Sequence, residues 1–156
     1  MSEPAFLLDV NVWLALAFPA HPHHALGVAA YRRATPARPA CFCRTTQQGF
    51  LRVATNPVFL RSSNITALTN RDAWAALSQL MASPSVAYCE EPAGVVAIWQ
   101  RLGAMPSMST KVWMDAYLAA FASAGGLEMV TLDQGFSQFA GVSVTILGPQ
   151  SPAQKP

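Results

Sequence analysis

The sequence predicts an α/β fold, a three-layer α/β/α sandwich around a central parallel sheet. Two observations predict it. Short apolar runs of about four residues alternate with longer segments in which apolar residues recur at helical spacing. The short runs are apolar at successive positions, as expected for strands that are covered by helices on both faces.

Composition limits the class of protein. Hydrophobic types make up 52% of the 156 residues and charged types 12%, whereas disordered chains are richer in charge and poorer in apolar residues. The apolar runs are shorter than the roughly 20 residues of a membrane helix. A net charge of +2 argues against broad, indiscriminate nucleic-acid binding. We expect one domain over residues 1–149, a flexible C-terminal tail over 150–156, no membrane association and a cytoplasmic location, with the cysteines as reduced thiols.

Two strands and two helices are expected in the first 43 residues. Residues 5–8 form a short apolar run that ends at an acid, as a buried strand would. A helix then begins near Asn11 and ends before Pro19, where a proline stops it. A second helix covers residues 25–33, and a second strand covers 40–43 after a Pro-rich link.

Capping residues mark the next two helices. Thr45 or Thr46 can cap a helix that ends at Asn56–Pro57, because Ser, Thr, Asp and Asn are favoured at helix starts. Asn70 is expected to cap a helix that continues to Met81.

The last third of the chain continues the alternation. Pro92 is expected in the first turn of a helix reaching Leu102, and Ser109 or Thr110 is expected to start a long helix that Gly125–Gly126 ends. A short helical turn is expected between the last two strands. The strands of this part are residues 86–89, 129–132 and 142–147.

Three of the four aspartates occupy unusual positions. Asp9 and Asp133 each follow an apolar strand, and Asp115 lies in the first turns of an apolar helix. Parallel sheets bind ligands at the carboxyl ends of their strands. Each acid taken alone is also explained by helix capping or the helix dipole. Together they indicate a site for a hard cation, Mg²⁺ or Mn²⁺, which can activate a water for phosphodiester hydrolysis.

Four segments, taken together, resemble a known family. Residues 7–12, 43–53, 114–119 and 130–133 resemble, in order and spacing, the PIN-domain ribonucleases, specifically toxins of the VapC type. The resemblance spans about residues 5–149. It implies the α/β/α sandwich, Mg²⁺-dependent cleavage of RNA, usually a tRNA or an rRNA loop, a VapB-like antitoxin partner and a homodimer.

The resemblance also assigns the site residues. Asp9, Asp115 and Asp133 correspond to the catalytic, metal-binding acids, and Asn11 to the polar residue often found beside the first acid. Gln47 stands where family members commonly have Glu. Because Gln forms hydrogen bonds but carries no charge, we expect one well-held metal instead of two.

Several other residues are candidates for supporting roles. The hydroxyls of Thr110 and Thr131 can orient a carboxylate, although capping explains Thr110 as well. Arg44 and Arg52 can grip RNA phosphates. The alternatives are solvated surface charge for both and an intramolecular ion pair for Arg52.

The remaining conspicuous residues have ordinary explanations. The histidines at positions 21, 23 and 24 suit a surface loop, with a part in substrate approach left open. The four tryptophans are expected to pack in the core or a dimer interface rather than to stack on bases. A tryptophan exposed on a face would indicate an antitoxin or dimer contact.

The preferred function is a metal-dependent endoribonuclease that acts as a toxin. One alternative is a PIN-fold binding module whose catalysis is weakened by Gln47. Another is a phosphatase of the haloacid-dehalogenase type, in which Asp9 would be the nucleophile. That chemistry needs a second acid where this chain has Asn11, so the residue counts against it.

Overall fold

The computed structural model describes residues 3–148 of the chain. Five strands form one sheet in the order β3-β2-β1-β4-β5, and all neighbouring pairs are parallel. The strands are β1 (Phe6–Leu8), β2 (Ala40–Phe42), β3 (Val86–Tyr88), β4 (Glu128–Thr131) and β5 (Val144–Ile146). The sequence-predicted strands are therefore all present. The first three are one residue shorter than expected and β5 is three residues shorter, whereas β4 has the expected length but begins one residue earlier.

Both faces of the sheet are apolar. Phe6 and Leu8 of β1 belong to one buried cluster, while Leu7 between them belongs to the other. The same alternation holds in β2, where Phe42 and Cys41 point to opposite sides. Because successive side chains of a strand face opposite sides, a strand covered on both faces reads as a continuous apolar run.

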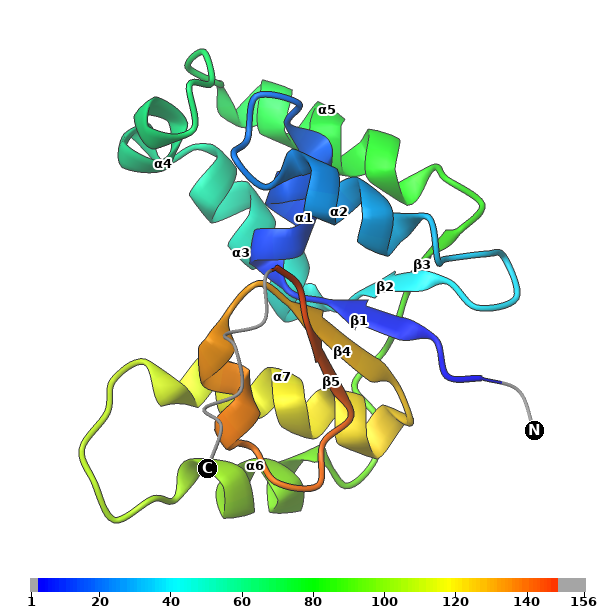
Figure 1. Ribbon diagram of the computed structural model, residues 1–156, viewed down its shortest axis with the longest axis vertical. Coiled ribbons are helices and arrows are strands. Elements are labelled where there is room, and N and C mark those ends of the chain that lie inside the picture. The colour runs from blue at the N-terminus through cyan, green and yellow to red at the C-terminus, as the bar shows by residue number, and fades with distance from the viewer. Residues whose placement is uncertain (1–2, 149–156) are drawn as a thin grey trace, which may run out of the picture.

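Helices cover both faces, which completes the predicted sandwich (Figure 1). One layer lies over the side of the sheet that carries Phe6 and Leu8, and α6 and α7 cover the other side. The first layer consists of α1 (Val10–Ala17), α2 (His24–Tyr31), α3 (Arg44–Ala54), α4 (Pro57–Ser62) and α5 (Asn70–Met81). The second consists of α6 (Val95–Gly103) and α7 (Val112–Gly125), with a short 3₁₀ helix, η1 (Gln134–Gln138), before β5.

Two helix starts differ from the expected ones because other residues supply the caps. Thr69, one residue before Asn70, caps α5: its hydroxyl accepts from the Asp72 N–H at 3.1 Å, and the Asp72 carboxylate accepts from the Thr69 N–H at 2.9 Å. In α3 the cap is Cys43, and Thr46 instead accepts the Cys43 N–H from inside the helix. These reciprocal bonds satisfy N–H groups that a helix start leaves free.

Three further differences concern residues that break helices. Asn56 and Pro57 do end α3, but they also start α4, which the sequence did not reveal; the Asn56 side chain accepts from the Val58 N–H at 2.9 Å. The helix expected from Pro92 begins only at Val95, after Gly94 with φ 86°. The long helix begins at Val112, so Thr110 precedes it.

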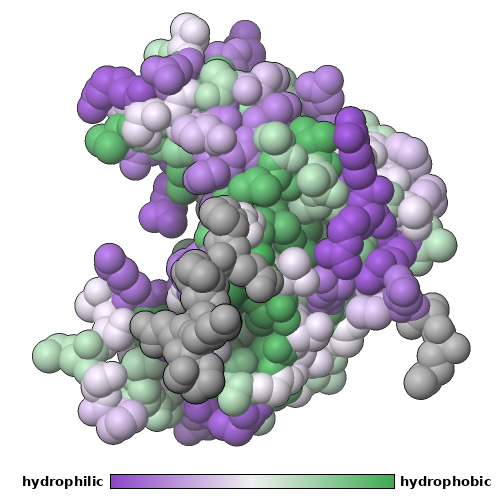
Figure 2. All heavy atoms as spheres, in the orientation of Figure 1, coloured by the Kyte–Doolittle hydropathy of each residue, from purple (hydrophilic) through white to green (hydrophobic). Residues whose placement is uncertain are grey.

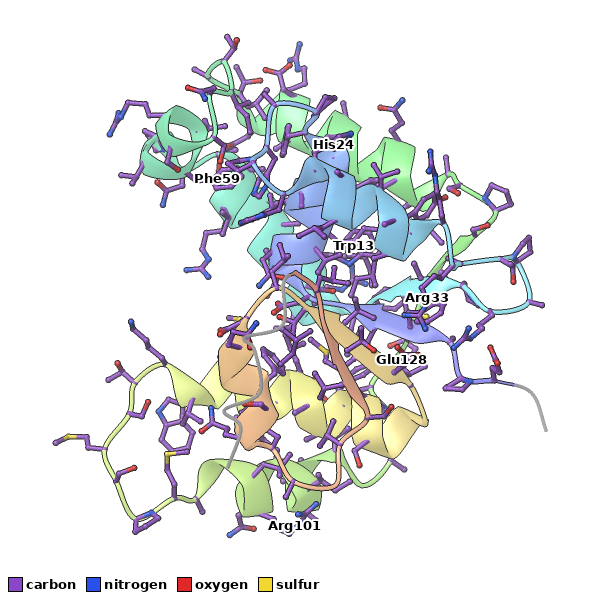
Figure 3. The ribbon with its side chains drawn as sticks, viewed as in Figure 1. Trp13, His24, Arg33, Phe59, Arg101 and Glu128 are labelled. Atoms are coloured by element: carbon purple, nitrogen blue, oxygen red, sulfur yellow. The ribbon has the colours of Figure 1, made fainter. Side chains whose placement is uncertain are left out.

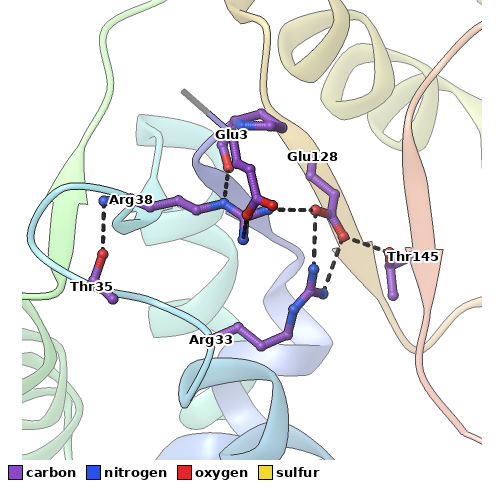
Figure 4. Close-up of polar contacts among 7 residues, drawn as sticks. Glu3, Arg33, Thr35, Arg38, Glu128 and Thr145 are labelled. Atoms are coloured by element: carbon purple, nitrogen blue, oxygen red, sulfur yellow. Dashed lines mark hydrogen bonds and ion pairs between the residues drawn. The ribbon is translucent and has the colours of Figure 1, made fainter. Parts of the chain in front are cut away.

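Charged residues tie the chain together at the amino edge of the sheet. The buried Glu128 carboxylate accepts from Arg33 at 3.1 and 3.3 Å, from Arg38 at 3.2 Å and from the Thr145 hydroxyl at 2.6 Å (Figure 4). Both guanidinium groups also lie over the ring of Phe6. This cluster is a structural one, because each of its charges has a partner.

The carboxyl edge, by contrast, is where the strand order reverses. From β1 the chain proceeds through β2 to β3 on one side, whereas β4 and β5 lie on the other side of β1. Crevices form at such reversals in parallel sheets. Figure 2 shows the molecule hollowed between the part that carries α3, α4 and α5 and the part that carries α6 and α7, with hydrophilic residues on both lips.

Among the described residues, no helix has the length and apolar character needed to cross a bilayer. The expected tail, residues 150–156, lies outside the described residues.

Candidate active site

Asp9 sits where β1 ends and α1 begins. Its carboxylate caps α1, accepting from the Val10 N–H at 2.7 Å, and accepts a second bond from the Thr131 hydroxyl at 2.7 Å. Only 8% of the residue is exposed. Burial raises the pKa of Asp9, and the charge of Asp133 raises it further, although these hydrogen bonds partly oppose the shift. The capping role and the site position therefore coexist in one residue.

Thr131, at the end of the neighbouring strand β4, links the groups of the site. Its oxygen accepts from the Asp133 N–H at 3.0 Å and from the Asn11 amide at 3.4 Å. The side-chain Oδ1 of Asn11 in turn accepts from the Leu132 N–H at 3.2 Å. These bonds hold the start of α1 against the end of β4, so that Asp9 and Asp133 are presented from adjacent strands.

Asp115 and Asp133 approach from two other elements. Asp115 lies in the first turn of α7 and is half-buried. Burial, followed by the charges of Asp9 and Asp133, raises its pKa to about 6. Asp133 is exposed, and its carboxylate caps η1 by accepting from the Gly135 N–H at 2.8 Å. The three acids line one cavity of about 330 Å³.

The donor set of this cavity fits a hard divalent cation. Carboxylates that share a space and raise one another's pKa favour a bound positive charge. Within residues 3–148, no three His, Cys, Asp or Glu side chains lie close enough together to hold a metal ion by themselves. An open arrangement suits Mg²⁺ and Mn²⁺, because Mg²⁺ keeps several waters and needs few protein carboxylates.

Three of the candidate residues lie away from the cavity. Gln47 accepts from Arg44 at 2.7 Å, and its amide points toward Met81. Arg44 lies over the ring of Tyr88 at the start of α3. Thr110 is exposed in the segment before α7 and lines a separate hollow with Trp113. The structure thus brings Asp9, Asn11, Arg52, Asp115 and Asp133 to the cavity, with Thr131 directly behind them.

On α3, the positions that face the cavity are Gly49, Arg52 and Val53. A Cβ atom at Gly49 would lie 2.6 Å from Cγ2 of Val10, so the close approach of α1 and α3 requires glycine there. The helix therefore contributes a cation and no acid to the cavity. Helix α3 contains no Asp or Glu, and Gln47 is not among the residues that line the cavity. Arg52 and Val53 follow Gly49 by three and four residues, and this spacing in the sequence indicates that the three lie on one face of the helix.

The sequence leaves open whether His21 takes part in substrate approach, and the structure places it on the cavity wall beside Phe59. Its Nδ1 accepts from the His23 N–H at 3.0 Å, and burial lowers the pKa of His21. Phe59 on α4 lies on the opposite side of the view from Arg33 and Glu128 (Figure 3). A neutral imidazole leaves Arg52 as the cation beside the acids. Within residues 3–148 the ion pairs join Arg33 and Arg38 to glutamates, so the ion pair considered for Arg52 does not form.

The fold and this placement of acids define the class of protein. Residues 6–142 match the model of the PIN domain, and the chain belongs to this family, as the sequence predicted. The chain is also 42% identical to Ribonuclease VapC41 of Mycobacterium tuberculosis over 142 residues. The aligned region covers 90% of this chain and 97% of that protein.

Solved structures agree on the fold. A chain of VapBC2 from Rickettsia felis, crystallised bound to a DNA fragment from its promoter, superposes with a TM-score of 0.67 at 9% identity, covering 92% of this chain and 99% of that one. Mycobacterium tuberculosis VapC20, described as a Sarcin-Ricin loop cleaving toxin, gives a TM-score of 0.62 at 16% identity, with 88% and 96% covered. The predicted α/β/α sandwich is confirmed.

Proposed function

We propose that this chain is a metal-dependent endoribonuclease that acts as the toxin of a VapBC-type toxin–antitoxin pair. The observation that carries the proposal is that Asp9, Asp115 and Asp133, from three separate elements, line one cavity at the carboxyl edge of the sheet. Membership of the PIN family and the 42% identity to a VapC ribonuclease support the same activity. The reaction is hydrolysis of an RNA phosphodiester bond.

The chain's own residues have distinct parts in this proposal. Asp9 is held in place by the Val10 N–H and the Thr131 hydroxyl, so it presents a preoriented carboxylate. Asp115 and Asp133 bring negative charge to the same space, where Mg²⁺ or Mn²⁺ would be held by the three acids. A divalent cation bound there supplies Lewis-acid stabilisation of phosphate charge and lowers the pKa of a water. Arg52 attracts the phosphate that enters the cavity.

Cleavage assays with paired aspartate variants test the proposal. RNA cleavage by the purified protein should require Mg²⁺ or Mn²⁺, stop on addition of EDTA, and fall by at least about 100-fold in Asp9→Asn and Asp115→Asn. Asp72→Asn is the matched control, because Asp72 is exposed in the first turn of α5, bonds the cap residue Thr69 and does not line the cavity. Cleavage that survives EDTA or either site variant would overturn the metal assignment.

The two alternative functions make different predictions in the same assays. A phosphatase would form a covalent phosphate on Asp9, which mass spectrometry detects; the Asn11 side chain, bonded to Thr131 and Leu132, offers no second acid for that chemistry. A binding module would hold RNA but leave it uncut with Mg²⁺ and Mn²⁺ alike. The RNA itself, which we expect to be a tRNA or an rRNA loop, is identified by sequencing RNA ends after induction in cells, with Asp9→Asn as control.

The proposal extends to partners and compartment. A VapB-like antitoxin should bind the chain and stop its cleavage, and a small upstream reading frame for a DNA-binding protein would be its source. We also propose a homodimer, which solution mass tests; a strict monomer at high concentration would contradict it. The cytoplasm is the proposed compartment, because the RNA substrates are there. Residues 1–149 are proposed as the functional domain.

A further inference from the structure

A second cavity adjoins the acidic one. It lies between α3 and α5 and has a volume of about 430 Å³. Arg52 lines both cavities, so the two spaces meet at its side chain. We call this second space the Trp74 groove; its walls include Gln48, Leu51, Arg52, Thr55, Asn70 and Trp74.

The aromatic ring in this groove is exposed. Trp74 is 58% exposed, whereas Trp13 is fully buried and stacked on Phe42. Among residues 3–148, the aromatic ring pairs do not include Trp74. Trp74 therefore does not pack in the core of the single chain, and the expected packing in a dimer interface stays a prediction. An exposed indole on a groove wall offers a flat surface for a planar ligand.

The other walls of the groove suit a nucleotide. Gln48 and Asn70 supply donors and acceptors that can bond the edges of a base, while Leu51 is apolar. The Thr55 hydroxyl already donates to the Leu51 carbonyl oxygen at 2.9 Å. Arg52 is its charged residue, and no acid is among the described residues that line it. A planar ligand with a negative group toward the acidic cavity therefore matches both the shape and the charge.

We infer that the Trp74 groove binds an unpaired base of the RNA, next to the phosphodiester bond in the acidic cavity. The inference rests on the proposed ribonuclease function and names the side chain on which a base beside the cut would stack. The base stacks on Trp74, and its phosphate lies at Arg52, between the two cavities. A base inside a duplex cannot reach this groove, so the substrate is single-stranded or looped at the cut.

A third hollow, on the other side of Asp115, is a weaker candidate. It shares Met114 with the acidic cavity and is walled by Trp99, Trp113 and Tyr117. The Trp99 indole donates to the Trp113 backbone carbonyl oxygen at 3.0 Å, and the ring of Trp99 meets Tyr117 edge-on, so the ring of Trp99 is already engaged. The ring of Trp113 is exposed. No cation lines this hollow among the described residues.

A binding measurement without cleavage tests the inference. The probe is oligouridylate carrying one 2-aminopurine, whose fluorescence falls on stacking, mixed with the protein in EDTA. Trp74→Ala should weaken binding about 5- to 50-fold and abolish the quenching, and Trp74→Phe should retain most of both. Ser78→Ala, one turn further along α5 and outside the groove, is the control. Wild-type quenching in Trp74→Ala would overturn the inference.

A cleavage measurement separates this inference from the proposed function. An RNA spanning the bond mapped in cells is prepared with an abasic site at each position beside the cut. The base site is supported if an abasic site at one position slows cleavage by the wild-type protein, and if Trp74→Ala cuts that same RNA no more slowly than the wild type does. Equal cleavage at all positions overturns it while leaving the ribonuclease function intact. A Trp74→Ala protein that cuts normally but escapes the antitoxin also overturns it, since the groove would then bind protein.

Discussion

Thr131 is the residue on which the groups of the acidic cavity depend. It is fully buried, its hydroxyl donates to Asp9, and its oxygen accepts from Asp133 and Asn11. Thr131→Val keeps the shape and removes these bonds, so it should lower cation affinity and cleavage by about 10- to 100-fold. The free energy of unfolding should fall by about 1–3 kcal/mol. Thr131→Ser should restore both, as measured by initial rates at varied Mg²⁺ and by urea unfolding; a Val variant with normal rates would refute this role.

Asp115 should make the stability of the metal-free protein depend on pH. Its pKa is raised to about 6 in the folded state from the ordinary 3.8. An acid whose pKa is higher in the folded than in the unfolded protein contributes stability that is fully present at a pH below its unfolded pKa. That stability is lost as pH rises from about 4 through 6. Asp115→Asn should therefore be more stable than wild type at pH 7 in EDTA, by about 1 kcal/mol because the half-exposed group is screened by solvent. Added Mg²⁺ should narrow the difference in stability between Asp115→Asn and wild type.

Urea unfolding between pH 4 and 8 measures the effect. Asp72→Asn is the control of opposite sign, because the bonds from Thr69 lower the pKa of Asp72 and its contribution to stability is lost as pH falls. A difference between Asp115→Asn and wild type that does not vary with pH would contradict the assignment.

At the scale of elements, the packing of α1 against α2 positions the start of the site. A Cβ atom at Gly27 on α2 would lie 2.7 Å from the backbone N of Leu16 on α1. The backbone cannot yield easily, so Gly27→Ala should cost about 2–3 kcal/mol of unfolding free energy. Gly103→Ala is the matched control, since its Cβ would meet its nearest neighbours at 3.6 Å and should add up to about 1 kcal/mol through helix propensity. Thermal unfolding of both variants checks this; equal midpoints would contradict it.

At the scale of the molecule, the two edges of the sheet have different tasks. The amino edge holds the paired charges around Glu128, and the carboxyl edge holds the acids of the cavity, which form no ion pair within residues 3–148. Glu128→Ala should lower the unfolding free energy by about 3 kcal/mol, because it leaves Arg33 and Arg38 without their buried partner. Cleavage per folded molecule should be unchanged at low temperature. Glu3→Ala removes an exposed partner of Arg38 and should change stability by less than about 1 kcal/mol.

Some features were determined by the sequence alone. The strands could be predicted because β1, β2 and β4 are buried on both faces and so leave continuous apolar runs. Asp9 and Asp133 could be placed at one edge because parallel strands bring their carboxyl ends together, whatever the side chains around them. The gathering of Asp115 with them followed from its position in the first turn of an apolar helix.

Other features were decided only by the tertiary structure. Which side of α3 faces the acids depends on how the helix is rotated against α1, and the contact of Gly49 with Val10 sets that rotation. Gln47 therefore turns toward Met81, and Arg52 turns to the cavity. The exposure of Trp74 likewise depends on which face of α5 packs against α3. Local spacing gives the period of a helix but not its rotation, because the rotation is fixed by contacts between residues far apart in the chain.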